Sequence, residues 1–374
     1  MIVRLSSYAR HCVQLLSPAY LGGFTFSDWI KLLHGYGWQV DWEYLPRAMI
    51  ATSGTMLTSL IHTLERRIAL ESTEERFEDR PLFILGLARS GTTHLFELLA
   101  RDPQFCFPTR FDCYNPHTFL SLRRLGILRL LSLLRSSRRY MDNVSVGWQS
   151  PAEDAIALAV LMLGGNRIGI IFPRTHGDDR KRLSDPLSSS PQPLDFVSAL
   201  TLFTRKLVHL HRRQPLYKSP DHMLSIAEIC RAFPDARFVT ILRNPCEQFA
   251  SLLAMYRSPA AGWGALQRPP TYTDESCFKY ISVVLGRYLA TRTLIPPGQI
   301  LEIKYHNLVS DSASTLESIY RGLGLTMPDD FRNQTPSTYE RNCHPELTTE
   351  VKNRLREIYQ PAVRAGLFDA EELM

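Results

Sequence analysis

Cysteine is scarce in this sequence of 374 residues, and no two cysteines stand at a metal-binding spacing. The seven cysteines are odd in number and include no Cys-x-x-Cys pair. Disulfide-stapled domains and zinc modules need paired cysteines at short spacings. The pattern therefore argues against a disulfide framework and a zinc site, and we expect no bound metal.

Long hydrophobic runs are also missing. The longest apolar stretch covers residues 155–163 and is interrupted at 164–167, whereas a helix needs roughly 20 apolar residues to cross a bilayer. Residues 1–10 lack the apolar core of a secretory signal. We therefore expect a cytoplasmic protein.

The sequence has no basic stripe interleaved with aromatic side chains. Its formal net charge is +6, but the lysines and arginines are scattered along the chain, so the pattern disfavours nucleic acid and suits a smaller anionic ligand. The 44% hydrophobic and 21% charged content are typical of a globular protein with a sizeable core.

The most informative segment that is present covers residues 81–94. Residues 82–85 are consecutive apolar residues, a pattern typical of a strand buried on both faces. Gly86 and Gly91 bracket the turn that follows, so its backbone N–H groups can approach an anion at the start of the next helix. We interpret the segment as a phosphate site.

This segment differs from the triphosphate-binding loop G-x-x-x-x-G-K-[ST] at one position. Thr92 stands where that loop has the lysine that reaches the β- and γ-phosphates. Arg89, inside the turn, supplies positive charge instead. The loop therefore fits a single terminal phosphate better than a triphosphate with magnesium.

A second strand, at 236–242, ends at Arg243. Pro245 suits the first position of the next helix, which places Ser251 in its second turn. Ligands of open α/β sheets bind beyond the carboxyl ends of the strands, so we expect Arg89 and Arg243 on the same rim, where they could hold two phosphates.

Together these segments resemble the sulfotransferases that use 3′-phosphoadenosine-5′-phosphosulfate, including their bacterial single-domain members and their tyrosylprotein branch. The motifs R-S-G-T-T and R-x-P-x-x-x-x-x-S occur in order, with residues 218–220 (Lys-Ser-Pro) between them. The resemblance implies a P-loop-like, three-layer α/β fold with a central parallel sheet, and this nucleotide as co-substrate without a metal. It also implies which residues hold the phosphosulfate end: Arg89, Ser90, Gly91, Thr92 and Thr93. By the same resemblance, Arg243 and Ser251 hold the 3′-phosphate.

We expect a helical N-terminal extension over residues 1–78 and a sulfotransferase domain over 79–374, with acceptor-site insertions at about 104–200. Residues 177–195 are polar and rich in Ser and Pro and predict a surface loop. Residues 119–140 predict a basic amphipathic helix, which either packs on the core with its arginines in solvent or makes peripheral contact with a membrane.

Lys218 is the first candidate for catalysis. It ends a short predicted strand and precedes Ser219 as a helix cap and Pro220 as a first helical residue. In tyrosylprotein relatives a lysine in K-D-P stabilises the bridging oxygen, and the resemblance suggests the same role for Lys218. The alternative is a solvated lysine or a structural ion pair.

Three residues compete for the role of general base. Glu153 and Asp154 stand where many bacterial relatives carry E-D-E, although both could instead stabilise a helix N-terminus. His222 is the rival, because a neutral imidazole has a suitable pKa. We prefer Glu153 slightly.

These observations predict an enzyme that moves a sulfuryl group to a hydroxyl, or as a second choice an amine, of a small-molecule or lipid-like acceptor. Two alternatives stay open, namely a catalytically silent nucleotide-binding protein that docks on membranes and an atypical P-loop kinase.

Overall fold

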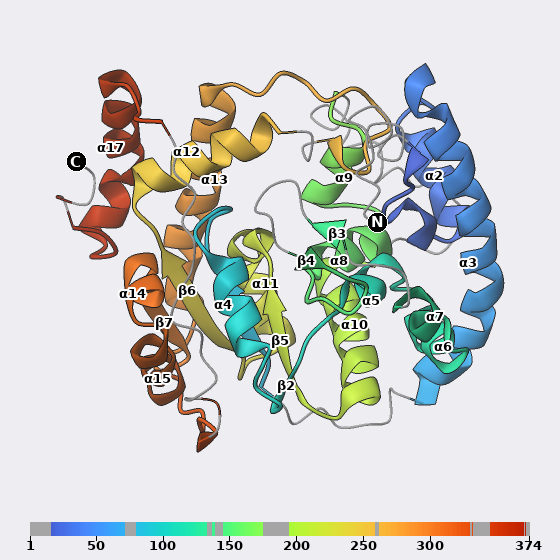
Figure 1. Ribbon diagram of the computed structural model, residues 1–374, viewed down its shortest axis with the longest axis horizontal. Coiled ribbons are helices and arrows are strands. Elements are labelled where there is room, and N and C mark those ends of the chain that lie inside the picture. Colours follow the sequence, from blue (N-terminus) through green and yellow to red (C-terminus); the bar gives the residue numbers. More distant parts are fainter. Residues whose placement is uncertain are drawn as a thin grey trace, which may run out of the picture.

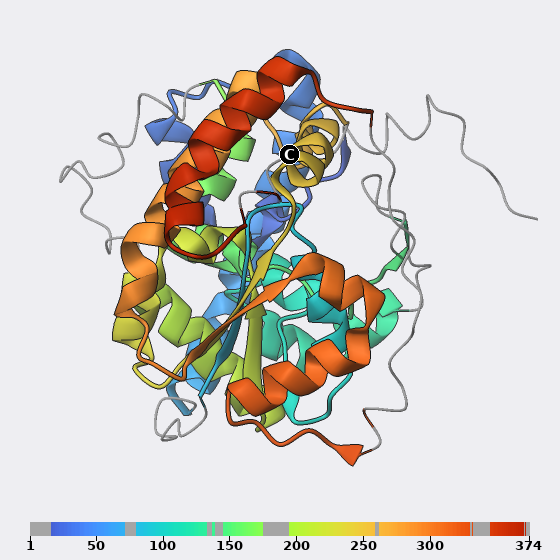
Figure 2. The ribbon, with the colours of Figure 1, turned by 90° about the vertical axis from the view of Figure 1, so that its left-hand side faces the viewer.

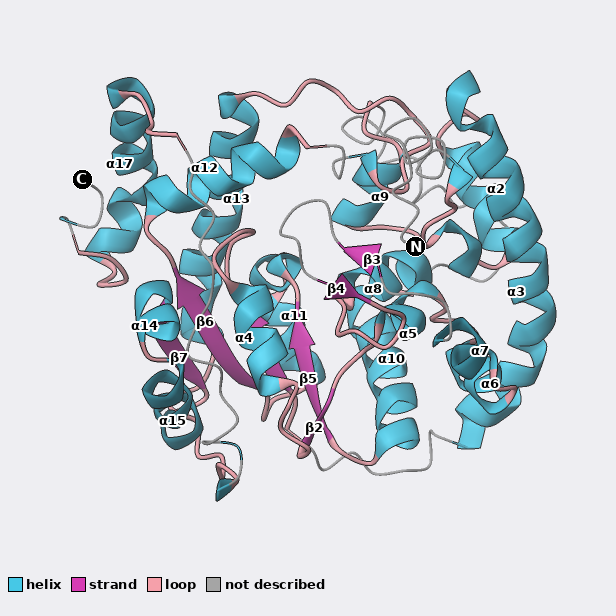
Figure 3. Ribbon diagram, viewed as in Figure 1, coloured by secondary structure: helices cyan, strands magenta, loops and turns pink. Residues whose placement is uncertain are grey.

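The computed structural model describes residues 16–71, 80–132, 137–138, 145–174, 194–258, 262–329, 331, 345–369 and 371. Its centre is a parallel sheet of five strands in the order β2-β5-β1-β6-β7 (Figures 1 and 3). The strands are β1 (Leu82–Leu85), β2 (Phe105–Cys106), β5 (Gln214–Lys218), β6 (Arg237–Leu242) and β7 (Ile300–Lys304). A separate antiparallel pair consists of β3 (Ser137–Arg138) and β4 (Ser145–Val146). The predicted α/β fold with a central parallel sheet is confirmed.

Helices cover both faces of the sheet. The helices after β1 whose bounds lie within the described residues are α4 (Thr92–Leu99), α5 (Arg110–Tyr114), α6 (Phe119–Arg124), α7 (Ile127–Ser132), α8 (Ala155–Met162), α9 (Asn166–Ile171), α10 (Phe196–His211), η3 (Pro220–Leu224), α11 (Ile226–Ala232), α12 (Pro245–Tyr256), α13 (Asp274–Thr291), η5 (Arg292–Leu294), α14 (Tyr305–Ser310), α15 (Ser312–Gly322) and α17 (Thr349–Arg364). Figure 2 shows α14 and α15 on one side of the strands and α13 on the other.

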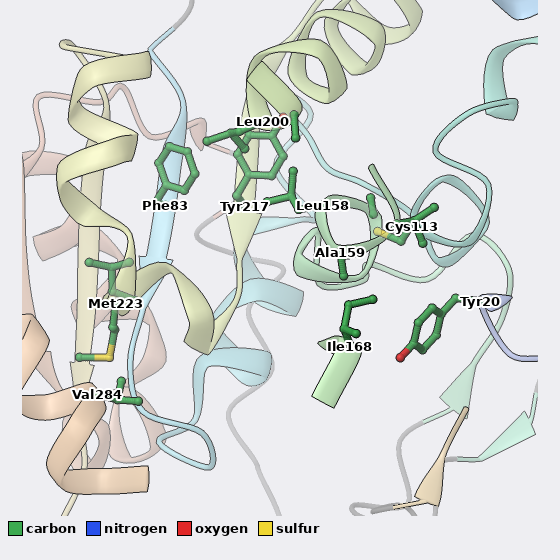
Figure 4. Packing of buried hydrophobic residues seen from close by; sticks show 14 of the residues in the cluster. Tyr20, Phe83, Cys113, Leu158, Ala159, Ile168, Leu200, Tyr217, Met223 and Val284 are labelled. Carbon is green, nitrogen blue, oxygen red and sulfur yellow. The ribbon is translucent and has the colours of Figure 1, made fainter. Parts of the chain in front are cut away.

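Successive residues of the central strand β1 belong to two different hydrophobic clusters. Leu82 and Ile84 pack with α4 and α15, whereas Phe83 and Leu85 pack in the larger cluster with α8, α10 and α13. Figure 4 shows Phe83 and Tyr217 on the strands, with Leu200 of α10 beside Tyr217. Since side chains alternate along a strand, the apolar run of β1 places hydrophobic side chains on both faces of the sheet. Helices pack against both faces, so the fold has three layers.

The elements before β1 that lie wholly within the described residues are η1 (Leu21–Gly23), α2 (Phe26–Gly35), η2 (Trp42–Tyr44) and α3 (Leu45–Glu71). They are the helices expected in this region, and α3 lies at the outer edge of the molecule (Figure 1). Glu65 of α3 forms a buried ion pair with Lys206 of α10, with Oε1 and Nζ 2.6 Å apart. The division of the chain into an extension over 1–78 and a domain over 79–374 stays a prediction.

The prediction of one helix over 119–140 is wrong. The chain forms α6 and then α7, and Gly126 between them has φ +75, a left-handed conformation that ends a helix and favours glycine. Arg123 does not point into solvent, because its guanidinium pairs with the buried Asp112 at 2.8 Å. Residues 133–136 and 139–144 lie outside the described residues, as does most of the predicted loop at 177–195.

Candidate active site

The turn between β1 and α4 is shaped by its glycines. Gly91 has φ +100, and a Cβ atom there would lie 2.4 Å from Cδ2 of the Tyr305 ring. A Cβ atom on Gly86 would lie 2.5 Å from Oγ of Ser90. Arg89 also has a positive φ of 70, which is uncommon for a residue with a side chain and recurs at functional sites. The turn therefore keeps a conformation that only small residues permit at both ends.

Hydrogen bonds fix the middle of this turn on both sides of Ala88. The Ala88 N–H donates to the Tyr280 hydroxyl at 2.9 Å, and Gln248 Nε2 donates to the Ala88 carbonyl at 2.7 Å. Tyr359 of the last helix donates to Gln248 Oε1 at 3.0 Å. Burial raises the pKa of Tyr280 and Tyr359, so both stay neutral hydroxyls. Helices α12, α13 and α17 thus hold the turn rigid.

The two predicted arginines lie together at the carboxyl ends of β1 and β6. Arg89 Nε donates to Ser251 Oγ at 3.1 Å, and Arg243 Nη1 donates to the Arg89 carbonyl at 3.0 Å. The Arg243 guanidinium lies 4.4 Å from the centre of the Tyr305 ring and pairs with Glu247 at 3.1 Å. The predicted phosphate-binding residues therefore form one cluster, and Tyr305, which the sequence analysis did not single out, lies against both of its motifs.

Ser90 and Thr92 are buried in this cluster. The Ser90 hydroxyl has no hydrogen-bond partner within the described residues, although a buried hydroxyl normally has one. An anion at the turn would supply the missing acceptor. The residues thus fit a phosphate or sulfate group.

Lys218 reaches the same turn from the end of β5. Strand β5 pairs with β1, with Ile84 beside Lys218 in the register, and the lysine is only 3% exposed. Its ammonium lies 3.2 Å from the Thr93 hydroxyl and 2.7 Å from Oε1 of Glu153. The predicted cap is also present, because Ser219 Oγ accepts the Asp221 N–H at 3.2 Å with Pro220 next in the chain.

Glu153 lies between two cations. Its Oε1 accepts from Lys218, and its Oε2 accepts from Nη2 of Arg167 on α9. Its side chain is 24% exposed, so solvent or an acceptor can reach it. Arg167 was missed in the sequence, where it is one scattered arginine after two glycines and no local signal relates it to Glu153.

His222 and Asp154 form a separate buried pair. Nε2 of His222 donates to Oδ2 of Asp154 at 2.8 Å, and the two side chains are at most 1% exposed. Asp154 Oδ1 and His222 Nδ1 have no hydrogen-bond partner within the described residues. The structure therefore divides the three base candidates into an accessible carboxylate beside Lys218 and a buried pair that joins the start of α8 to η3.

No group of three or more His, Cys, Asp or Glu side chains that could hold a metal ion occurs in the part of the chain that the structure describes. Within the same part, no helix is both long enough and apolar enough to pass through a bilayer.

Comparisons with known proteins extend these observations. A model of the sulfotransferase family matches residues 81–329. The omega-hydroxy-beta-dihydromenaquinone-9 sulfotransferases Stf3 of Mycobacterium bovis and Mycobacterium tuberculosis are 28% identical to this chain over 368 residues, which cover 94% of it and 91% of the relative.

Solved structures show the same fold. Sulfotransferase STF9 of Mycobacterium avium has a TM-score of 0.61 at 20% identity, with 86% of each chain covered. Sulfotransferase STF1 of Mycobacterium tuberculosis has a TM-score of 0.60 at 18% identity, with 88% of this chain and 91% of that chain covered.

Proposed function

The chain belongs to the sulfotransferase family, and we propose that it transfers the sulfuryl group of 3′-phosphoadenosine-5′-phosphosulfate to a hydroxyl of a lipid-like acceptor. The observation that carries this proposal is the position of Lys218, whose ammonium contacts Thr93 at the phosphate turn and Glu153 on the accessible side. In this position the Lys218 ammonium lies next to both the phosphosulfate of the proposed donor and the hydroxyl of the proposed acceptor.

The donor half of the proposal rests on two neighbouring groups of anion ligands. The turn with Arg89, Ser90 and the start of α4 suits the phosphosulfate. Arg243 and Ser251 lie beside it and suit a second phosphate. An arginine binds phosphate through charge-assisted hydrogen bonds, and Thr92 in place of the P-loop lysine disfavours a triphosphate.

The reaction needs a cation and a proton acceptor. The acceptor oxygen attacks sulfur, the bond between sulfur and the bridging oxygen breaks, and that electron pair leaves with adenosine 3′,5′-bisphosphate. Lys218 stabilises the charge that develops on the bridging oxygen. Glu153 takes the acceptor's proton, after giving up one of its contacts with Lys218 or Arg167.

Glu153 is the best candidate for the general base, because the two alternative residues are paired with each other and do not reach solvent. Asp154 and His222 are buried and hydrogen-bonded together, so we assign them a positioning role, in which they join the residue after Glu153 to the turn after Lys218. The lipid-like acceptor is suggested by the mycobacterial relatives, which are sulfotransferases of omega-hydroxy-beta-dihydromenaquinone-9. We place the protein in the cytoplasm, since no disulfide joins the described cysteines, which suits a reducing compartment.

The proposal is tested with isotope-labelled donor and a membrane lipid extract. We expect a sulfated lipid, identified by mass spectrometry, and one adenosine 3′,5′-bisphosphate released per product. Calorimetry in parallel should show tighter binding of this bisphosphate than of ATP, without magnesium. Tight bisphosphate binding with no product from a broad range of alcohols and amines would instead indicate a silent binding protein, and magnesium-dependent ATP binding would indicate a kinase.

A further inference from the structure

Helix α3 carries its hydrophobic residues on the outside of the molecule. Large apolar side chains of α3 are 44% to 70% exposed; they are Leu45, Met49, Ile50, Met56, Leu57, Leu60 and Leu64. At 3.6 residues per turn they occupy an arc of roughly 140°. We call these seven residues the outer stripe.

The inward face of the same helix is polar. Arg47, Thr55, Thr58 and Glu65 are buried, and each has a hydrogen-bonding or ionic partner. Thr58 Oγ1 donates to the Gly22 carbonyl at 2.7 Å, and Glu65 pairs with Lys206 at 2.6 Å. A helix on the surface of a globular protein normally shows the opposite arrangement, with apolar residues inward and polar residues outward. The outer stripe therefore does not serve the core of this molecule.

The borders of the outer stripe carry tryptophan and arginine. Trp42, just before α3, is 78% exposed, and Arg66 is exposed near the other end. Helix α6 is attached to that end, because Glu65 accepts the N–H groups of Leu120 and Ser121 at 3.1 and 2.6 Å.

The short helices α6 and α7 continue this character. Leu125 and Leu130 are exposed beside the exposed Arg124 and Arg129. Among the described side chains of α3, α6 and α7, no carboxylate is exposed. The one acidic residue among these described side chains is Glu65, which is buried.

We infer that the outer stripe, together with Arg66, Arg124 and Arg129, docks on a membrane surface that contains anionic lipids. Apolar side chains bordered by tryptophan and arginine match the boundary between acyl chains and headgroups, where the apolar groups insert and the cations meet lipid phosphates. A second copy of the same surface would offer these arginines no exposed carboxylate among its described side chains, so charge complementarity favours lipid. This inference does not depend on the proposed enzymatic activity.

The membrane contact is thus centred on α3, whereas the sequence pattern suggested 119–140 alone. If the acceptor is a lipid, docking through α3 would hold the enzyme at the surface in which that acceptor resides. Activity is not needed to test the inference.

Vesicle flotation with the full chain provides the test, in the absence of donor and acceptor. Vesicles of phosphatidylcholine are compared with vesicles that also contain phosphatidylglycerol. The variant Met49→Gln/Leu57→Gln/Leu60→Gln changes only exposed positions and keeps residues with high helix propensity. We expect it to reduce partitioning by about tenfold or more relative to wild type. The matched control is Val283→Gln/Leu294→Gln, two exposed apolar residues on α13 and η5, which should bind as wild type does.

A second variant, Arg66→Gln/Arg124→Gln/Arg129→Gln, should bind both kinds of vesicle alike, because it removes the charges that distinguish them. Unchanged melting temperature and unchanged adenosine 3′,5′-bisphosphate binding establish that each variant is folded. Failure of the wild type to float, or equal flotation of the outer-stripe variant, overturns the inference. So does analytical ultracentrifugation that shows a dimer held by the outer stripe, together with no vesicle binding.

Discussion

At the scale of single residues, Lys218 carries the proposed chemistry. Its charge is needed mostly in the transition state, so Lys218→Met should lower turnover by roughly 10²- to 10⁴-fold with a modest change in donor affinity. Steady-state kinetics and calorimetry with adenosine 3′,5′-bisphosphate measure the two effects separately. An equal loss of affinity and turnover would indicate that Lys218 only binds the donor.

Glu153 should show the signature of a general base. Its replacement by Gln should slow transfer to an aliphatic alcohol far more than transfer to an acidic phenol, because a phenol can ionise without help. His222→Ala and Asp154→Asn should slow both acceptors alike, since these residues position Glu153 and Lys218 and contact each other rather than solvent. If none of the three variants distinguishes the acceptors, the proton leaves by another route and the assignment of Glu153 is wrong.

At the scale of elements, the junction between the phosphate turn and α4 depends on the absence of a side chain at Gly91. Gly91→Ala introduces a Cβ atom that meets the ring of Tyr305 in a backbone conformation that alanine adopts at a cost of about 1 kcal/mol or more. We expect adenosine 3′,5′-bisphosphate to bind at least about tenfold more weakly.

Gly126 provides a matched control for this substitution. It also has a positive φ, of 75, but a Cβ atom there meets nothing within 4 Å. Gly126→Ala should therefore carry a similar backbone cost in a melting experiment and leave ligand binding unchanged. Equal binding losses in the two variants would mean that general destabilisation of the fold, rather than contact with Tyr305, weakens binding.

At the scale of the whole molecule, the buried pair of Glu65 and Lys206 connects α3 to the helices on the sheet. Burial lowers the pKa of Lys206, and Glu65 opposes this shift. Glu65→Gln leaves the lysine without its counter-charge, which should lower the free energy of unfolding by about 3–5 kcal/mol. Denaturant unfolding followed by circular dichroism measures this loss.

The double variant Glu65→Gln/Lys206→Met distinguishes the ion pair from simple packing. It removes the unpaired charge, so much of the lost stability should return. If both variants are equally unstable, the hydrogen bonds of Glu65 to the start of α6 matter more than its charge.

Strands β1, β5 and β6, the glycine-bounded turn and the cap after Lys218 could be predicted from the sequence, because each depends on residues close together in the chain. The four apolar residues of β1, Gly91 before a helix and the Ser219-Pro220 pair all act through local backbone conformation. The rule that ligands bind at the carboxyl ends of parallel strands then brought Arg89 and Arg243 together before any contact was known. The error over 119–140 was also local, since one glycine with positive φ divides a continuous leucine and arginine pattern.

Only the tertiary structure decided which base candidate is accessible and which face of α3 points outward. Glu153 and Asp154 are adjacent in sequence, yet one meets Lys218 and Arg167 while the other is buried against His222. The leucines of α3 have helical spacing whether they face the core or the solvent, and the buried partners of Arg47, Thr58 and Glu65 come from distant segments. Periodicity along one helix identifies its apolar face, but the direction of that face is set by the polar contacts that the rest of the fold provides.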